Sequence, residues 1–558
     1  MPVKLVQSTP SAYQYPLLIK QLLLTPLAIA PDQEICYQDK RRHSYRELRQ
    51  RIGRLANCLT TLGVDAGDTV AVMDWDSHRY LDCYFAIPMM GAIIQTVNVR
   101  LNAEQILYSL NHAEADVLLV NSEFFPIVEA IAARLTTVKK LVLLNDEATE
   151  PALPAAISQV LHYAGEYETL LAAADSDYPF ADFDENAQAT VFYTTGTTGN
   201  PKGVYFSHRQ LVLHALGCAA ALGGANGNGR LHREDVYMPL TPMFHVHAWG
   251  FPYIATMLGL KQVYPGRYQP DVLCRLIVSE GVTFSHCVPT ILHMVLSHPH
   301  AKDLDLSGWK LIIGGSALPE AMAAAAFKRG IDLFTGYGMS ETCPVLTLAH
   351  LSTTDMQGSP EEQAVLRAKT GLPLPLVDLR VVDADMNDVP HDGRATGEVI
   401  VRSPWLTQGY LKAPEASEDL WAGGYLHTSD IGNIDAAGYL KVTDRSKDVI
   451  KVGGEWTSSL QLEDIVAKHE AVQEVAVIGV ADAKWGERPL ALVVLKADYV
   501  GQVTEHAIRN YAAHAIEAAG VSRYGLLLQV SFVKHLLKTS VGKMNKLAMR
   551  ANPQALRD

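Results

Sequence analysis

The sequence has few cysteines, and none of them form a recognisable pair. Seven occur in 558 residues, and no two have the Cys-x-x-Cys spacing; they are residues 36, 58, 83, 218, 274, 287 and 343. This pattern argues against a disulfide framework and against a cysteine-based zinc site. We therefore expect reduced thiols that serve as small core residues in a cytoplasmic protein.

The sequence also lacks a long hydrophobic run and an excess of basic residues. Lys20, Gln21 and Pro26 interrupt the most apolar N-terminal stretch, residues 17–30, so neither a signal peptide nor a membrane span is expected. Contact with a membrane surface stays compatible with the sequence. With 47 Lys and Arg against 60 Asp and Glu, the net charge of −13 argues against a nucleic-acid-binding surface.

What the sequence does contain is a regular alternation of helical and strand patterns. Helical spacing at 45–62 and 78–91 alternates with short apolar strands, which we place at 69–73, 93–97, 117–120 and 141–144. Such alternation predicts an α/β fold with largely parallel sheets. A chain of 558 residues is too long to fold around one hydrophobic core, so a large compound domain and a smaller one are expected. Residues 145–184 are expected to form a surface excursion that carries no recognisable functional residues.

Special residues concentrate between Tyr193 and Val204. The apolar strand 189–193 runs into a loop rich in threonine and glycine, and helical spacing begins near His208, so the layout predicted is strand, loop, helix. Glycines bring backbone N–H groups close to a ligand and threonine hydroxyls add donors, which suits a polyphosphate. The alternative is a solvent-exposed connector. The loop is not the usual P-loop, because Lys202 lies between Pro201 and Gly203.

Two further strand–loop units, residues 310–319 and 331–342, place glycines just after an apolar strand. Ligands of open α/β sheets gather at the carboxyl ends of strands. Either loop alone reads equally well as a tight turn, but together with the first loop and Glu341 they favour a nucleotide site. His245 and His247 lack a third ligand in a recognisable pattern, so a structural or substrate-lining role is preferred to metal binding.

Beyond Gly371 the segments become short and rich in β-structure, which predicts a β subdomain at about 371–443. A charged stretch, 443–456, follows and is interpreted as a hinge. Strands at 475–478 and 490–494 then indicate a compact C-terminal α/β unit. The expected division is an N-terminal domain of residues 1–443 and a C-terminal domain of residues 444–558.

Taken together, these motifs resemble the adenylate-forming superfamily of AMP-binding enzymes. The resemblance rests on the loop 193–204, Gly-Tyr-Gly-Met-Ser-Glu at 336–341, Thr-Ser-Asp at 428–430, Asp-Arg at 444–445 and Gly-Lys at 542–543. These motifs occur in the family's order over nearly the whole chain. Residues 242–249, 369–373 and 453–459 are most similar to bacterial medium- and long-chain fatty acyl-CoA synthetases.

The resemblance implies a site for ATP, Mg²⁺ and coenzyme A, and an activity as an AMP-forming fatty acid:CoA ligase. It assigns Thr194 and Glu341 to Mg²⁺, Asp430 to the ribose hydroxyls, Asp444 to the hinge and Lys543 to catalysis. Further nucleotide or CoA contacts are implied for Thr195, Gly196, Thr197, Thr198, Gly199, Lys202, Gly315, Ser316, Gly336, Tyr337, Ser340, Arg445, Lys447, Lys451 and Trp456. Substrate contacts are implied for His245, Val246, Trp249, Gly338 and Met339.

Two positions depart from the family pattern, and a third position, Gly338, decides the expected substrate. Ser429 replaces a glycine beside the ribose contact, and Leu537 replaces a proline before the terminal basic residues. Related acetyl-activating enzymes carry tryptophan at the position of Gly338, so glycine here predicts an open acyl pocket, and Gly338→Trp is expected to favour acetate. Trp249 is either a movable wall of that pocket or ordinary core packing. Lys543 without the resemblance would read as part of an exposed basic tail.

The chemistry follows from the poor reactivity of a carboxylate. Its attack on the α-phosphorus of ATP gives an acyl adenylate, and AMP then leaves when a thiol attacks. Dense negative charge on the phosphate oxygens calls for positioned cations and donors. An acyl-AMP ligase that loads a carrier protein and an inactive nucleotide-binding homologue are the alternatives. The expected partners are small molecules, with a homodimer also compatible.

Overall fold

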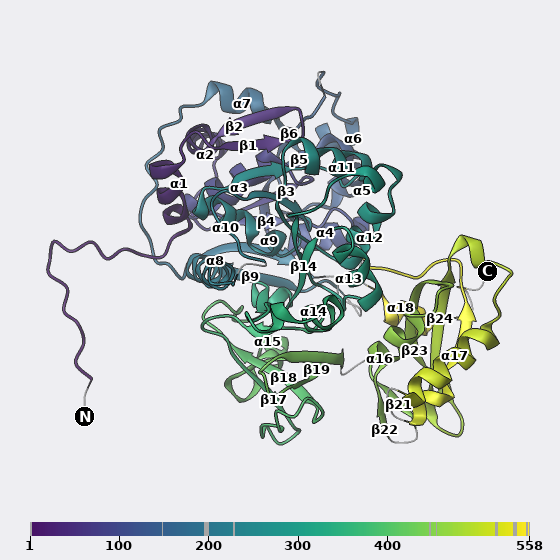
Figure 1. The fold of residues 1–558 in the computed structure, drawn as a ribbon. Coiled ribbons are helices and arrows are strands. Elements are labelled where there is room, and N and C mark those ends of the chain that lie inside the picture. The colour runs from purple at the N-terminus through teal and green to yellow at the C-terminus, as the bar shows by residue number, and fades with distance from the viewer. Residues whose placement is uncertain are drawn as a thin grey trace.

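The computed structural model describes residues 3–147, 149–194, 200–226, 229–445, 448–452, 455–518, 523–539, 544–553 and 556. Figure 1 shows a large N-terminal body, below it the sheet that contains β17 (Asp378–Val382), β18 (Gly397–Arg402) and β19 (Leu426–Ile434), and a smaller C-terminal unit to one side. The expected α/β fold with a large N-terminal and a smaller C-terminal domain is confirmed.

One mostly parallel sheet of the N-terminal body has the order β7-β6-β5-β3-β4-β8-β9. Its strands are β3 (Thr69–Met73), β4 (Ile93–Thr96), β5 (Ala115–Asn121), β6 (Lys140–Leu144), β7 (His162–Glu166), β8 (Gln188–Tyr193) and β9 (Gly203–Ser207). The strands expected at 69–73, 93–97, 117–120 and 141–144 are therefore confirmed. Their side chains are buried because helices cover parallel sheets on both faces.

Two local predictions in this region are wrong. The polyphosphate-type loop lies between two antiparallel strands, β8 and β9, and the helix begins only after β9. Residues 145–184 are not merely a surface excursion, because β7 pairs with β6 and α7 (Tyr167–Ala173) packs on the body. Glu168 of α7 forms an ion pair with Arg51 and a hydrogen bond with the His78 ring, which polar composition alone did not reveal.

A second sheet has the order β16-β15-β14-β13-β12-β10-β11-β1-β2. Its strands are β1 (Glu34–Tyr37), β2 (Arg41–Ser44), β10 (Val236–Leu240), β11 (Lys261–Tyr264), β12 (Phe284–Cys287), β13 (Lys310–Ile313), β14 (Asp332–Gly338), β15 (Val345–Leu348) and β16 (Leu372–Pro373). From β1 to β14 neighbouring strands run parallel, while β2, β15 and β16 are antiparallel edges. The ends of β13 and β14 thus open at the same edge.

Helices fill the space around both sheets. Capping boxes begin three of those described: Ser44 with Glu47 starts α2, Ser207 with Gln210 starts α8, and Ser359 with Glu362 starts α14. Besides α7, the helices of the body are α1 (Leu24–Ile29), α2 (Tyr45–Thr61), α3 (His78–Met89), α4 (Ala103–His112), α5 (Phe125–Ile131), α6 (Ala155–Ser158), α8 (His208–Gly223), α9 (Val246–Trp249), α10 (Phe251–Leu258), α11 (Pro270–Ser279), α12 (Pro289–Ser297), α13 (Glu320–Phe327) and α14 (Pro360–Arg367). All seven cysteines are buried and unpaired, as expected.

The remaining chain forms an antiparallel sheet and the C-terminal unit. The sheet β17-β18-β19-β20 contains β17 (Asp378–Val382), β18 (Gly397–Arg402), β19 (Leu426–Ile434) and β20 (Leu440–Arg445), with α15 (Pro414–Leu420) beside it. The C-terminal elements are β21 (Ile450–Val452), β22 (Glu455–Thr457), α16 (Ser459–Ala467), β23 (Val472–Asp482), β24 (Gly486–Leu495), α17 (Glu505–Ala518), β25 (Gln529–Phe532) and α18 (Lys546–Ala551). These include the strands expected at 475–478 and 490–494.

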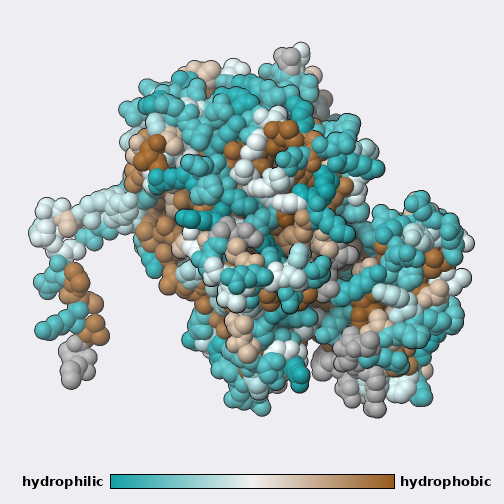
Figure 2. Space-filling view, viewed as in Figure 1, coloured by the Kyte–Doolittle hydropathy of each residue, from teal (hydrophilic) through white to brown (hydrophobic). Residues whose placement is uncertain are grey.

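The N-terminal segment is extended and exposed. Figure 2 shows it standing away from the body, and Val3, Leu5 and Val6 are 85%, 84% and 98% exposed. Within the described ranges no helix is both long enough and apolar enough to span a bilayer.

Candidate active site

Trp249 lies between two cavities at the carboxyl ends of the strands of the second sheet. An inner cavity is lined by Gly315, Gly336 and Tyr337 among others, and an outer one by Leu240, Tyr268 and Ile291 among others. Both cavities also touch His245 and Trp249. Each offers about 30 Å³ to the centre of a water molecule, which is room for only a few waters.

The backbone that carries Trp249 has an unusual left-handed turn. Residues Val246, His247, Ala248 and Trp249 have φ values of 47°, 54°, 47° and 57°. L-residues pay about 1–2 kcal/mol each in this region, so surrounding contacts must hold the turn in place. Part of that support comes from His247, which is fully buried beside the rings of Phe192 and Tyr253.

The two histidines of this turn have different surroundings. His245 lines both cavities, whereas His247 is buried among aromatic rings and its ring nitrogens have no hydrogen-bond partner within the described ranges. Burial lowers the pKa of His247 to about 3, so its ring is neutral. The buried position of His247 is that of a structural residue, whereas a substrate-lining role for His245 stays a prediction.

Glycines allow the ends of β13 and β14 to approach Trp249. A Cβ on Gly314 would lie 2.7 Å from the carbonyl oxygen of Gly336 and 2.9 Å from the Trp249 ring. A Cβ on Gly336 would lie 2.9 Å from Ile312. The next residues, Gly315, Ser316, Gly338, Met339 and Ser340, continue the same edge, and all but Ser316 line the inner cavity with Val246. That an adenine ring lies against these glycines stays a prediction.

Gly338 is enclosed by neighbouring backbone, which changes the expected effect of a tryptophan there. It does line the inner cavity, but a Cβ there would lie 1.7 Å from the carbonyl oxygen of Pro344. A tryptophan at 338 would therefore collide with backbone rather than simply fill the acyl pocket. The expected shift of Gly338→Trp towards acetate is no longer a clean test, since the substitution requires residues 338–344 to move.

Tyr410 joins the base of the threonine/glycine loop to Glu341. Its hydroxyl donates to Glu341 Oε1 at 2.7 Å, and Lys202 Nζ lies 4.4 Å from the centre of its ring. The loop is closed below by a hydrogen bond from the Thr194 N–H to the Lys202 carbonyl at 3.0 Å. Thr194, Lys202 and Glu341 thus belong to one connected group. Thr195, Gly196, Thr197, Thr198 and Gly199 lie outside the described residues.

The surroundings of Glu341 suit the binding of a cation. Its side chain is buried, with 8% of the residue exposed, and the hydrogen bond it accepts from Tyr410 comes from a neutral donor. Within the described ranges no ion pair involves Glu341. A buried carboxylate that no protein cation pairs with, among the described residues, offers the kind of oxygen ligand that Mg²⁺ prefers. The assignment of Thr194 and Glu341 to the metal remains a proposal.

The acid proposed for the ribose, Asp430, is held by two partners. The Tyr337 hydroxyl donates to its Oδ2 at 2.7 Å and Arg445 Nε donates to its Oδ1 at 3.1 Å. Burial, together with the Asp430 carboxylate, raises the pKa of Tyr337, so the phenol stays neutral and donates. These donors satisfy the carboxylate in the positions where ribose hydroxyls are expected to bind.

Ser429 precedes Asp430 and stands where the family pattern has a glycine. Its backbone conformation shows why glycine suits this position. Ser429 has φ = 58°, a conformation that glycine adopts without penalty and serine does not. Its N–H nevertheless donates to Glu398 Oε1 at 3.0 Å. The local backbone geometry is therefore kept, at the cost of strain.

The expected hinge residue connects the β17–β20 sheet with the C-terminal unit. Asp444 lies in β20, and its carboxylate accepts hydrogen bonds from the Ser459 N–H and hydroxyl at 2.5 and 3.1 Å. Lys546 Nζ in turn contacts Ser459 Oγ and Glu463 Oε1, each at 2.7 Å. This buried group joins the hinge strand, α16 and the start of α18.

Other expected contacts from this side are only partly described. Lys451 lies opposite Trp456 in the β21–β22 pair, and its N–H donates to Glu487. Lys447 and Lys543 lie outside the described residues. The sequence motifs did not point to Tyr410, Ser459 or Lys546. For Tyr410 the only local signal was the dipeptide Gly409-Tyr410, which follows a stretch without a helical pattern.

The comparisons with known proteins agree with this geometry. The family model of the AMP-binding enzymes matches residues 27–411, and that of the AMP-binding enzyme C-terminal domain matches residues 461–543. A long-chain-fatty-acid–CoA ligase of Thermus thermophilus is 40% identical over 91% of this chain and 90% of its own. A 3-methylmercaptopropionyl-CoA ligase of Ruegeria lacuscaerulensis is 39% identical over 82% of this chain and 83% of its own.

Among solved structures, the anthranilate CoA ligase AuaEII in complex with anthranoyl-AMP has a similar fold. Its TM-score is 0.82 with 24% identity, over 96% of this chain and 98% of that one. The matched family models cover most of the sequence. The chain therefore belongs to the family of AMP-binding enzymes.

Proposed function

We propose that this protein is an ATP-dependent acyl-CoA synthetase that activates a medium- or long-chain fatty acid through an acyl-AMP intermediate. The observation that carries the proposal is the position of Trp249 between the glycine-lined inner cavity and an outer one that Leu240, Val288 and Ile291 line together with Arg100, Thr241 and Thr290. AMP would occupy the inner side, and the acyl chain would extend past Trp249 into the outer side.

The residues around the inner cavity have distinct roles in this proposal. The acid's carboxylate oxygen attacks the α-phosphorus, the bond to the pyrophosphate oxygen breaks, and pyrophosphate leaves. Lys202 and the threonine/glycine loop hold the departing phosphates, while Asp430 fixes the ribose and so the line of attack. Mg²⁺, held by Thr194 and Glu341, would neutralise charge on the phosphate oxygens. Lys543 would donate to the α-phosphate oxygens.

A long acyl chain cannot fit while Trp249 stays in place, because each cavity has room for only a few waters. Trp249 is 7% exposed and rests on His286 at 5.0 Å between ring centres. Its left-handed backbone is costly, so a bound chain that moves the turn would release part of that cost. We assign to Trp249 the role of a movable wall.

Pyrophosphate release measured with acids from C2 to C18, with and without CoA, tests the activity and its chain length. Wild-type enzyme should prefer medium or long chains and form free acyl-CoA without a carrier protein. Trp249→Ala should join the cavities and lower the KM for long chains relative to short ones, while Trp249→Phe should stay near wild type. A profile that peaks at short acids and is unchanged by Trp249→Ala would reject the fatty-acid assignment.

The same assay separates the alternatives. An acyl-AMP ligase would release pyrophosphate but form no acyl-CoA, and an inactive homologue would release none. Because Thr194, Lys202 and Glu341 stay connected through Tyr410, an inactive homologue is disfavoured. The short thioether acid named for the Ruegeria relative should be included in the series, since that relative is nearly as similar as the fatty-acid ligase.

The proposal includes a domain rotation about Asp444 between the two half-reactions. The division at 443/444 is supported by the position of Asp444 at the end of β20, where its carboxylate is bonded to the first residue of α16. Asp444→Pro should stop the rotation and leave one half-reaction active. Unchanged overall turnover in this variant would contradict it.

A further inference from the structure

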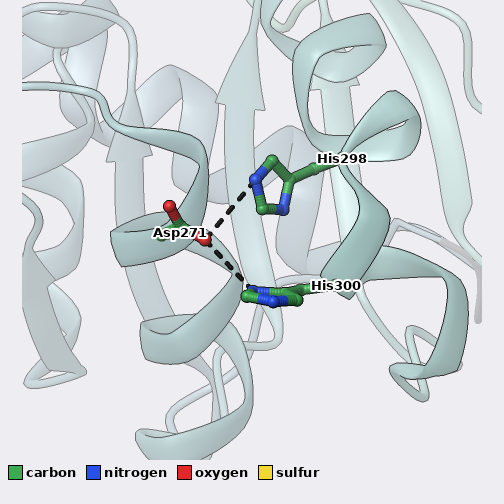
Figure 3. Close-up of side chains that lie close together, drawn as sticks. All are labelled: Asp271, His298 and His300. Atoms are coloured by element: carbon green, nitrogen blue, oxygen red, sulfur yellow. Dashed lines mark ion pairs between the residues drawn. The ribbon is translucent and has the colours of Figure 1, made fainter.

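Two histidines and an aspartate meet on the surface, outside the residues used by the proposed reaction. Asp271 belongs to the first turn of α11, and His298 and His300 flank the junction between α12 and the short turn Pro299–Asp303. Asp271 Oδ1 lies 3.4 Å from His298 Nε2 and 3.1 Å from His300 Nδ1. Figure 3 shows the two rings directed towards the same carboxylate.

These distances suit ligands arranged around one metal ion. Ligands about 2.0–2.1 Å from a tetrahedral ion lie about 3.3 Å from one another. The two contacts of Asp271, 3.4 and 3.1 Å, bracket that value, and all three ligand atoms lie within 4.8 Å of one another. A charge-assisted hydrogen bond between histidine and carboxylate would typically be shorter, about 2.7–2.9 Å.

The charges around Asp271 leave this carboxylate available to an added cation. Within the described ranges, its ion pairs are those with the two histidines. Arg275, one helical turn further along α11, pairs instead with Asp39 at 2.7 Å. The side chains of Asp271 and His300 are 69% and 76% exposed, so an ion can reach them from solvent.

A second cluster of possible metal ligands has similar spacing, but its carboxylates are already paired with protein cations. Glu34, Cys36 and Glu280 also place their ligand atoms close together. There, however, Arg42 contacts Glu280 at 2.6 Å and Lys261 contacts it at 3.0 Å. Two protein cations already neutralise those carboxylates, so a metal ion would be repelled.

We propose that Asp271, His298 and His300 bind one divalent transition-metal ion of the Zn²⁺ class, with water completing its coordination. Two imidazole nitrogens and one carboxylate oxygen favour Zn²⁺, Co²⁺ or Ni²⁺, whereas Mg²⁺ and Ca²⁺ prefer oxygen ligands alone. The site is separate from the Mg²⁺ site proposed at Thr194 and Glu341.

Such an ion would tie together two elements that form the wall of the outer cavity. Ile291 in the first turn of α12 lines this cavity, and so does Tyr268, two residues before the start of α11. The metal ligands lie at the start of α11 and just after the end of α12. Bound metal would therefore restrain the wall on which the acyl chain is proposed to rest.

Calorimetric titration of the full-length, chelator-treated protein with Zn²⁺ tests the proposal. Wild-type protein should bind one Zn²⁺ per chain at this site, and saturation should raise Tm by a few degrees. His300→Ala and Asp271→Asn should each weaken binding at least tenfold. His293→Ala, which removes another histidine from α12, should bind like wild type, and Co²⁺ should give visible absorption bands in both. Circular dichroism checks that each variant is folded.

Several results would overturn the proposal: no saturable Zn²⁺ binding by wild type, equal binding by His300→Ala, or an equal loss in His293→Ala. Displacement of Zn²⁺ by a modest excess of Mg²⁺ would contradict the argument from the ligand types. None of these measurements depends on ATP, CoA or an acid, so the outcome is independent of the proposed ligase activity.

Discussion

Removing the Tyr410 hydroxyl should impair adenylation by loosening Glu341. The bond from this hydroxyl to Glu341 Oε1 is 2.7 Å long, and the residues are 9% and 8% exposed. A hydrogen bond to a charged group contributes about 1.5–3 kcal/mol, and water entering the site would replace part of it. We therefore expect Tyr410→Phe to lose about 1–2 kcal/mol of both unfolding free energy and transition-state stabilisation.

In kinetic terms, 1–2 kcal/mol corresponds to a decrease of about 5- to 30-fold in kcat/KM for ATP, measured by pyrophosphate release. Half-saturation with Mg²⁺ should shift to higher concentration, because Glu341 would no longer be held in one orientation. Thioester formation from supplied acyl-AMP should change little. Tyr425→Phe is the matched control, since Tyr425 is also 9% exposed and donates to a carboxylate, that of Asp378, at 2.9 Å.

A double-mutant cycle decides whether Tyr410 acts through Glu341. If it does, Tyr410→Phe should have little further effect on adenylation in a Glu341→Gln background. Additive losses, within about 0.5 kcal/mol, would refute the reasoning. So would a Tyr425→Phe variant whose adenylation falls as far as that of Tyr410→Phe.

Three further variants test other parts of the structure. Ser429→Gly should raise the unfolding free energy by up to about 1 kcal/mol, because relief of the left-handed strain exceeds the added flexibility of the unfolded chain; a lower urea midpoint would contradict this. Burial raises the pKa of Asp76 to about 7, so the folded state binds this proton more tightly than the unfolded state does, and stability is lost as pH rises from about 4 to 7. Asp76→Asn should therefore gain about 2–3 kcal/mol relative to wild type between pH 5 and pH 8 in urea unfolding, and parallel pH profiles would exclude this cause. Lys543→Ala should slow adenylation by about 10²–10³ while thioester formation from acyl-AMP largely survives, and equal loss in both half-reactions would argue against its role.

Much of the secondary structure was predictable because it depends on neighbours along the chain. The helix expected at 45–62 is α2, Tyr45–Thr61, and the strand expected at 69–73 is β3. Periodicity and capping residues operate within one or two turns, and the sequence displays them directly. The glycine loops and Glu341 were likewise recognisable, because each motif is a continuous stretch.

Elements that need a distant partner were not predictable in this way. Strand β9 forms only because Gly203–Ser207 pairs back onto β8, and a short polar β7 is stabilised by β6 rather than by its own pattern. The consequence of a side chain at Gly338 depends on the Pro344 carbonyl, whose position no local pattern reveals.

The sequence by itself determined the fold class and the motifs of an adenylate-forming enzyme, since both are written in local spacing and residue type. Only the tertiary structure decided which side chains meet. Tyr410 reaches Glu341 across 69 residues of sequence, Tyr337 reaches Asp430 across 93, and Trp249 separates two cavities whose walls come from several strands. The physical reason is that a hydrogen bond or a cavity wall depends on distance in space, which the packing of the sheets sets and residue order does not.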